Sequence, residues 1–252
     1  MNISDRRRLL GPSEARFPSV GVSSSLEREM ESADDEAAQN SMFLKTGLVE
    51  TATGSAYVEA DDCIVQVSVY GPRPIRGSFI EKASFSVECK FLPYVTKAAG
   101  DHQNTNPNAK PGMNSIEQRI STYVETALLP CLLLEKYPKS TIDIYVTVIS
   151  NKSASLLELT NWIVNCSSLA LVDSAIEIKD IVTGGVATLE EKNDTKKSQC
   201  LASFMNLRNN EIVGFWIDGG QELNEKVLNK TLDTCQERAH VVRRNFNGFL
   251  TT

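Results

Sequence analysis

Residues 63–70, Cys-Ile-Val-Gln-Val-Ser-Val-Tyr, place an apolar residue at every second position, and most of these are β-branched. Successive side chains of a strand point to opposite faces, so this alternation predicts a strand with one buried face. Three neighbouring segments also have the composition of short strands: residues 43–50, 55–60 and 78–91. Gly54 and Asp61-Asp62 supply turn residues between neighbours. The start of the domain is therefore predicted to be an antiparallel meander of four strands.

After this region the apolar spacing becomes helical. Helices are predicted from Ser115 to a stop or kink at Pro130, over 154–178, and over 221–246 with Gly248 as the stop signal. Strands are predicted at 140–150, 199–207 and 211–217, the last two joined by a hairpin turn at 208–210. The run Thr183-Gly184-Gly185-Val186 lacks the lysine and the spacing of a phosphate-binding loop and is interpreted as a turn. This order of elements predicts an α+β fold, in which helices pack on a largely antiparallel or mixed sheet.

The first 41 residues have a different character from the rest of the chain. They contain three consecutive serines, an acidic stretch between residues 27 and 36, and few large apolar residues. Such a segment cannot offset the entropy lost on ordering, so residues 1–41 are predicted to be a mostly flexible extension. Residues 4–12 combine charge with leucine and suit a docking arm, with a solvated tail as the alternative. Residues 42–252 form the predicted domain.

Composition excludes several classes of protein. A net charge of −6 argues against a dedicated nucleic-acid-binding domain, which normally has a basic excess. The six cysteines form no Cys-x-x-Cys pair, and only His102 and His240 could assist them, so neither a metal site nor a cofactor is expected. Reduced, buried thiols of an intracellular protein are the better interpretation. No secretory signal or membrane span is predicted, because the longest apolar runs are too short.

Several strings in this order resemble RNase PH and its relatives in the ring of the eukaryotic RNA exosome. The general ones are Gly54-Ser55-Ala56-Tyr57-Val58-Glu59 and the helix start Ile116-Glu117-Gln118-Arg119-Ile120. The more specific ones are similar to one fungal ring subunit: residues 5–12, 70–79, 135–140 and 211–216. The resemblance implies an RNase PH-like fold of the ribosomal protein S5 domain 2-like type.

The phosphate-binding elements of that family do not match here. Where the family has Gly-Gly-Arg-Thr before its first helix, this chain has Pro111-Gly112-Met113-Asn114, and a methionine cannot hold phosphate as a guanidinium does. A glycine-rich loop before the second helix is replaced by residues 155–162, where Glu158 would repel phosphate. Glu190 and Asp194 are either remnants of the family's acidic cluster or part of a solvated loop. No catalytic residue is predicted.

The resemblance therefore implies a non-catalytic structural subunit of the exosome core ring, which supports 3′–5′ RNA processing and degradation. Its implied partners are other RNase PH-like subunits in a six-membered ring, cap subunits with S1 or KH domains, a processive nuclease, and single-stranded RNA in the channel. The implied location is the nucleus and nucleolus, and also the cytoplasm. The alternatives are a phosphate-dependent 3′–5′ exoribonuclease whose active site is shared with a partner, and a stand-alone binding protein without an RNA role.

The candidate RNA contact is Arg73-Pro74-Ile75-Arg76-Gly77, predicted to be a loop between two strands. Gly71 and Pro72 fix the chain where it leaves the sheet, and the loop is expected to project two guanidiniums without a nearby acid. The resemblance places this loop at the central channel. Arginine binds phosphates and stacks on bases without demanding a sequence. The alternative is that Arg73 and Arg76 are surface arginines paired across a subunit interface.

Overall fold

A computed structural model describes residues 42–60, 63–77, 79–93, 95, 114–151, 155–189, 198–207, 209–218 and 225–251. Contacts divide the chain into residues 1–40 and residues 41–252, and everything described here belongs to the second unit. The predicted extension and docking arm, the Asn-rich loop with His102, and Glu190 and Asp194 lie outside the described residues. The predicted α+β class is confirmed, with two sheets and three long helices among the described residues.

The larger sheet has five strands in the order β1-β2-β3-β5-β4. Their bounds are β1 Met42–Thr46, β2 Gly54–Ala60, β3 Cys63–Pro74, β4 Ser84–Phe91 and β5 Ser140–Asn151. The first three strands form the predicted antiparallel meander. The fourth does not continue it, because β5 pairs antiparallel with β3 and parallel with β4. A helix connects β4 to β5, and such a crossover allows parallel neighbours where a tight turn does not. β4 also begins later than predicted, since Phe79 and Ile80 are exposed in the connection.

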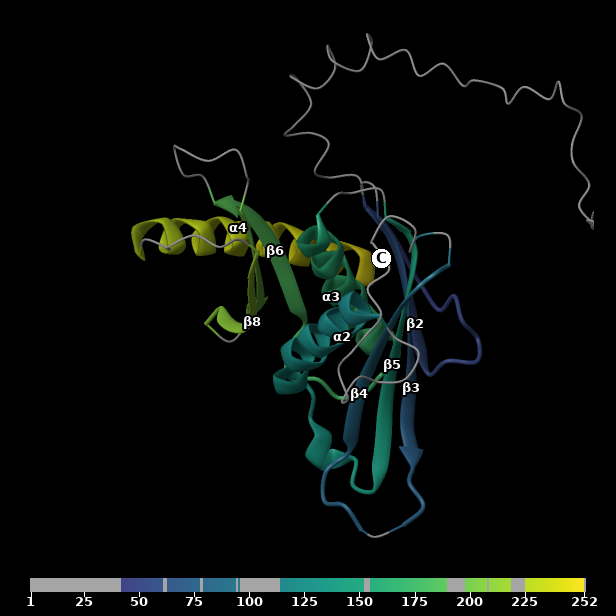
Figure 1. The fold of residues 1–252 in the computed structure, drawn as a ribbon. Helices are drawn as coiled ribbons and strands as arrows, with labels where there is room; N and C mark the ends of the chain where they lie inside the picture. The colour runs from purple at the N-terminus through teal and green to yellow at the C-terminus, as the bar shows by residue number, and fades with distance from the viewer. Residues whose placement is uncertain are drawn as a thin grey trace, which may run out of the picture. The chain divides into compact units, whose positions relative to one another are not determined.

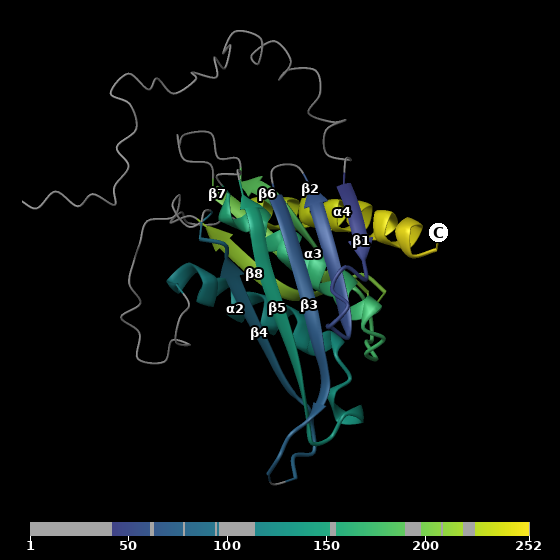
Figure 2. The same cartoon turned by 90° about the vertical axis from the view of Figure 1, so that its right-hand side faces the viewer.

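Two helices, α2 Ser115–Leu128 and α3 Leu156–Asp173, pack against one face of this sheet. The inward side chains of β3, namely Val65, Val67 and Val69, are completely buried there. No described helix covers the opposite face (Figure 2), and Tyr145 is exposed on it. This one-sided burial is the physical basis of the alternation at 63–70. Pro130 ends α2 as predicted, in a short 3₁₀ turn at Leu129–Cys131, whereas α3 ends at Asp173, before the predicted 178.

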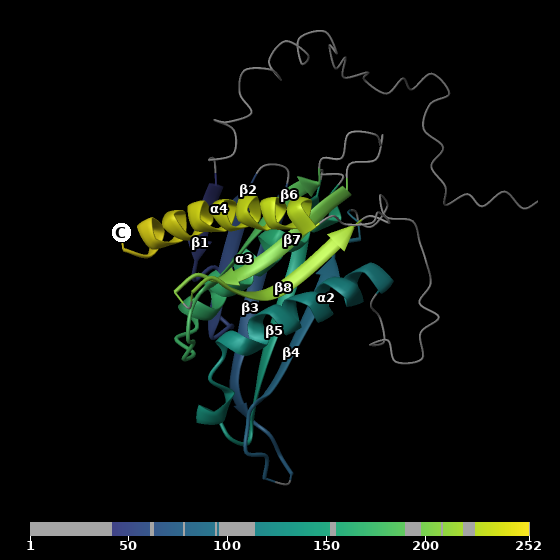
Figure 3. The ribbon, with the colours of Figure 1, turned by 90° about the vertical axis from the view of Figure 1, so that its left-hand side faces the viewer.

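The smaller sheet has three antiparallel strands, β6 Val182–Leu189, β7 Ser198–Met205 and β8 Glu211–Asp218. The long helix α4, Glu225–Leu250, covers one face (Figures 1 and 3), and α3 contacts β6 and β7 from the other side. The predicted hairpin between β7 and β8 is confirmed by Asn209 and Asn210, whose φ angles are 53° and 56°. Gly248 lies inside α4, so its interpretation as a helix stop was wrong.

The interpretation of residues 183–186 as a turn was also wrong, because these residues form the centre of β6. Both glycines allow a neighbour to approach closely, as glycines inside strands often do. A Cβ atom on Gly185 would lie 2.1 Å from the carbonyl oxygen of Cys235 in α4. One on Gly184 would lie 2.4 Å from Oδ1 of Asn161 in α3. The two glycines thus let β6 fit between two helices.

All six cysteines are buried, as predicted. In the part of the chain that the structure describes, no group of three His, Cys, Asp or Glu side chains could hold a metal ion. None of the helices described is both long enough and apolar enough to cross a membrane.

Candidate functional site

The N-terminus of α2 is occupied by a carboxylate of the chain itself. Glu117 is 5% exposed, and its Oε2 accepts the backbone N–H of Asn114 at 2.6 Å. Its Oε1 accepts the backbone N–H of Phe91 at 2.9 Å. A helix N-terminus is an attractive site for phosphate because its N–H groups point outward with a positive dipole. Here that position is filled by a buried anion that also ties α2 to the end of β4.

The N-terminus of α3 has a similar arrangement. Ser155 is the N-cap, and its Oγ accepts the backbone N–H of Glu158 at 3.3 Å. The same hydroxyl is hydrogen-bonded to the side chain of Gln199 in β7. Glu158 contributes the only charge in the first turn of α3. An incoming phosphate would meet a capped helix end and a carboxylate, so this position disfavours anion binding.

Neither helix end therefore provides what phosphorolysis needs. Two anionic reactants must be held by concentrated positive charge or by open backbone donors. The described residues at the two ends supply acids and satisfied N–H groups instead. Residues 111–113 lie outside the described residues, and the substitution of Met113 for the family arginine remains a sequence observation.

Arg73 does not lie in a loop free of acids, and that expectation was wrong. It lies in β3, where Nη2 contacts Oδ2 of Asp143 at 3.0 Å and the guanidinium lies 5.3 Å from the centre of the Tyr70 ring. Asp143 also accepts the hydroxyl of Ser86 at 2.8 Å. β3 continues past Gly71 and pairs with β5 as far as Pro74, and this pairing brings Arg73 close to Asp143 in space. The charge of Arg73 is thus partly compensated on the open face of the sheet.

Arg76 is different, since it is exposed beyond the end of β3 and forms no ion pair with any described residue. The chain is held just before it by the backbone N–H of Ile75, which donates to the carbonyl of Lys139 at 3.0 Å. Two lysines near this end of the molecule are already paired, Lys82 with Glu135 and Lys136 with Glu177. The two candidate arginines are therefore close in sequence, but the charge of Arg76 is more available to a ligand than that of Arg73, which is paired with Asp143.

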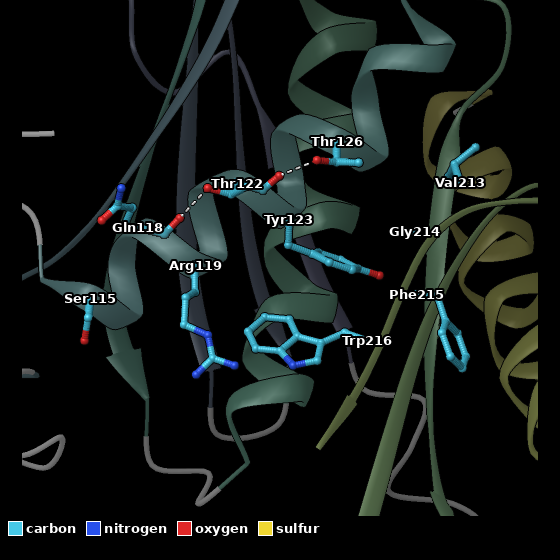
Figure 4. A pocket seen from close by; sticks show the side chains of 10 residues that line it. All are labelled: Ser115, Gln118, Arg119, Thr122, Tyr123, Thr126, Val213, Gly214, Phe215 and Trp216. Carbon is cyan, nitrogen blue, oxygen red and sulfur yellow. Dashed lines mark hydrogen bonds between the residues drawn. The ribbon is translucent and has the colours of Figure 1, made fainter. Parts of the chain in front are cut away.

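A groove with a volume of about 570 Å³ lies between α2 and β8 (Figure 4). Five polar side chains of α2 line one wall, and residues 213–216 of β8 line the other. Tyr123 and Trp216 point into it, with ring centres 5.6 Å apart. The guanidinium of Arg119 lies 5.2 Å from the centre of the Trp216 ring. The groove thus combines an aromatic floor with a cation.

The sequence-based analysis missed this groove. Tyr123 is held by a 3.0 Å hydrogen bond between its hydroxyl and that of Ser203, and burial raises its pKa. Gly214 makes the approach possible, because a Cβ atom there would lie 2.9 Å from the Tyr123 hydroxyl. Arg119 and Trp216 are far apart in sequence, and nothing in the spacing of either segment predicts their contact. The one available signal was a glycine next to an aromatic residue within a predicted strand.

Both a family model and curated relatives match this chain. Residues 39–177 match the model of the 3′ exoribonuclease family, domain 1 (RNase PH). The chain is 30% identical over 198 residues to a protein of Schizosaccharomyces pombe named exosome complex component mtr3, covering 76% of this chain and 70% of that protein. It is 25% identical to exosome complex component MTR3 of Chaetomium thermophilum, covering 86% and 87% of the two chains.

The fold is also similar to a solved structure, that of rice (Oryza sativa) Rrp46. The TM-score is 0.62 at 21% sequence identity, and the match covers 84% of this chain and 93% of the rice chain. This coverage is larger than that of the family model, which spans residues 39–177.

Proposed function

The chain belongs to the RNase PH family of 3′ exoribonucleases, and from that premise we propose that it is a non-catalytic structural subunit of the RNA exosome core ring. Its relatives named exosome complex components support membership in such an assembly. Its work there is to pack against other RNase PH-like subunits and to form part of the path of single-stranded RNA. Cap subunits with S1 or KH domains and a processive nuclease are the further partners of this assembly.

The observation that carries the absence of catalysis is the loss of both phosphate-binding elements of the family, with Met113 where the family has arginine and Glu158 in the first turn of α3. A methionine cannot hold phosphate as a guanidinium does. Glu158 stands at a helix end where phosphate would have to bind, and like charges close together repel strongly where water is excluded. The alternative, an active site completed by arginines from a partner chain, would have to overcome this acid.

Reconstitution with the neighbouring subunits separates these functions. The assembly would be incubated with single-stranded RNA with and without inorganic phosphate, and the release of nucleoside diphosphates would be measured. We expect no phosphate-dependent release by the chain alone. If the assembly releases diphosphates, a Glu158→Lys variant of this chain should leave the rate unchanged. Phosphate-dependent release by the chain alone, or loss of the activity of an intact assembly that contains this variant, would contradict the proposal.

We assign Arg76, with a smaller contribution from Arg73, to the RNA path. Arg76 forms no ion pair with a described residue, whereas Arg73 is paired with Asp143. The length of RNA protected by the reconstituted assembly should fall for Arg76→Glu, and further for the Arg73→Glu, Arg76→Glu double variant. Arg244→Glu, an exposed change on α4, is the matched control. If the double variant protects the same length of RNA as the wild type, neither arginine contacts the RNA path.

The location that fits this role is the nucleus and nucleolus, with a cytoplasmic fraction, because rRNA processing, RNA surveillance and mRNA turnover take place there. A fluorescent fusion of the full chain, imaged in the cells that encode it, tests this. Exclusion from the nucleus would contradict the nuclear part of the proposal.

A further inference from the structure

β8 differs from the other edge strands of the two sheets. β1 is short and carries Lys45, and β4 carries Glu88 and Lys90. β6 is buried at seven of its eight positions between α3 and α4. β8 instead has six uncharged residues between Glu211 and Asp218, and no proline. Native proteins usually protect an edge strand with charges, prolines, bulges or covering elements.

β8 has one of these protective features, a bulge at Val213. The register with β7 shifts there, so that Ser203 faces Gly214 and Phe204 faces Ile212. The regular edge therefore runs from Gly214 to Asp218 and overlaps the wall of the groove. Phe215 within it is 43% exposed. Four consecutive residues of β8, Val213 to Trp216, line the groove, so the groove follows this part of the edge strand.

The charge of the groove distinguishes between possible occupants. Arg119 is the one charged residue among its lining residues, and it forms no ion pair with any described side chain. A second copy of this chain, related by two-fold symmetry, would bring the same groove lining, with another Arg119 and no acid among the lining residues. A single-stranded nucleic acid would need several cations along its backbone. A polypeptide with a carboxylate matches both the cation and the open strand edge.

We propose that the α2–β8 groove binds an extended, acidic segment of a different polypeptide chain, which pairs its backbone with β8 at residues 214–218. Main-chain hydrogen bonds hold such a segment to the outer edge of β8, with which no described strand pairs, and side-chain pockets select it. An apolar side chain of the segment packs on Trp216 and Tyr123, residue types that dominate the energetics of interfaces. A carboxylate of the segment binds Arg119, whose planar guanidinium suits two parallel hydrogen bonds. This inference is independent of ring membership, because any partner with such a segment satisfies it.

Photo-crosslinking in the native assembly tests the proposal. The tagged full chain, with p-benzoylphenylalanine in place of Phe215, would be expressed in the cells that encode it, irradiated and digested, and the crosslinked peptides sequenced by mass spectrometry. We expect crosslinks to one extended segment of another chain that contains Asp or Glu. The matched control replaces Phe79, which is 71% exposed in the β3–β4 connection, and should not reach that segment.

A second variant checks the role of the cation. Arg119→Glu in the Phe215-labelled chain should reduce this crosslink at least tenfold, while Arg244→Glu leaves it unchanged. Crosslinks to RNA, to a second copy of this chain, to its own residues, or to nothing would overturn the inference, and so would a crosslink that does not respond to Arg119→Glu. The ring proposal would fail by a different result, namely that the native assembly contains no other RNase PH-like chains. A crosslink to an acidic segment within such an assembly would still support the inference.

Discussion

The two sheets of this protein bury their residues in different ways. The larger sheet is covered by helices on one face, so neighbouring positions such as Gln66 and Val67 have different environments. The smaller sheet lies between α4 on one side and α3 on the other, and seven of the eight residues of β7 are buried. The sequence of a strand covered on one face alternates between apolar and polar residues. The sequence of a strand covered on both faces lacks this alternation, because all its residues are apolar or small.

Aspartate substitutions at neighbouring positions test this difference most strongly. Val67→Asp should destabilise the fold by at least about 3–5 kcal/mol, because it buries an uncompensated charge, while Gln66→Asp should cost no more than about 1 kcal/mol. In β7, Leu201→Asp and Ala202→Asp should both have the large effect, since both side chains are fully buried. Urea unfolding monitored by circular dichroism measures all four. A tolerated charge at either β7 position would contradict the two-sided burial.

The attachment of α4 to the smaller sheet depends on a buried ion pair. Nη2 of Arg243 contacts Oδ1 of Asp180 at 2.7 Å, with side-chain exposures of 11% and 0%. Asp180 also accepts the backbone N–H groups of Ile181 and Leu207, at 2.7 and 2.8 Å. Arg243→Ala leaves this carboxylate buried without its cation and should cost about 3–5 kcal/mol.

Arg244→Ala is the control for this prediction, because the next residue of α4 is exposed. It should change the free energy of unfolding by less than about 0.5 kcal/mol. The salt bridge between Arg73 and Asp143 on the open face of the larger sheet is half exposed, and its removal should cost no more than about 1 kcal/mol. If Arg243→Ala and Arg73→Ala lowered the free energy of unfolding equally, the predicted difference between the buried ion pair and the exposed one would be wrong.

The glycines of β6 provide a smaller test. In Gly185→Ala the new Cβ meets backbone of α4, which cannot move alone, so we expect a loss of about 1–3 kcal/mol. In Gly184→Ala it meets the side-chain oxygen of Asn161, which can rotate, and the loss should be smaller. Gly248→Ala in α4 meets nothing within 4 Å and should stabilise the protein by about 1 kcal/mol. Thermal unfolding of the three variants gives the order, and a tolerated Gly185→Ala would mean that α4 shifts easily.

The same contrast explains what could be predicted from the sequence. Alternation in residues 63–70 and helical spacing after Ser115 identified β3 and α2, because each of these elements presents one face to the core. α3 is buried on most of its surface and was identified by its long apolar run. β6 was missed because its central glycines are typical of a turn, and the reason for them lies in Asn161 and Cys235, on two other elements. Hydrophobic pattern also cannot show that β5 separates β3 from β4.

The candidate sites follow the same rule. Glu158 was identified because the family resemblance places a phosphate-binding loop at residues 155–162, and its position in the first turn of α3 is a local feature of the chain. The pairing of Arg73 with Asp143 was missed because it depends on the register between β3 and β5. The contact between Arg119 and Trp216 depends on the packing of α2 beside β8, two elements that β5, α3, β6 and β7 separate in the chain. Contacts set by tertiary packing leave no signal in one chain's local pattern.

The smallest predicted effect concerns a buried thiol beneath the larger sheet. Burial raises the pKa of Cys131 from 9.0 to about 12, and its thiol donates to the carbonyl of Leu128. The unfolded chain therefore releases this proton at lower pH than the folded one. The contribution to stability is complete below pH 9 and is lost as the pH rises from 9 towards 12. Between pH 8 and pH 10 this one group should cost about 1 kcal/mol.

Urea unfolding of the wild type and Cys131→Ala at pH 8 and pH 10 isolates this contribution. The variant also leaves a small cavity, which lowers its stability at both pH values, so the informative quantity is the difference between the two pH dependences. The wild type should lose about 1 kcal/mol more than the variant over this range. Identical losses would mean that the thiol ionises equally easily in both states, and that the core beneath the larger sheet admits water at Cys131.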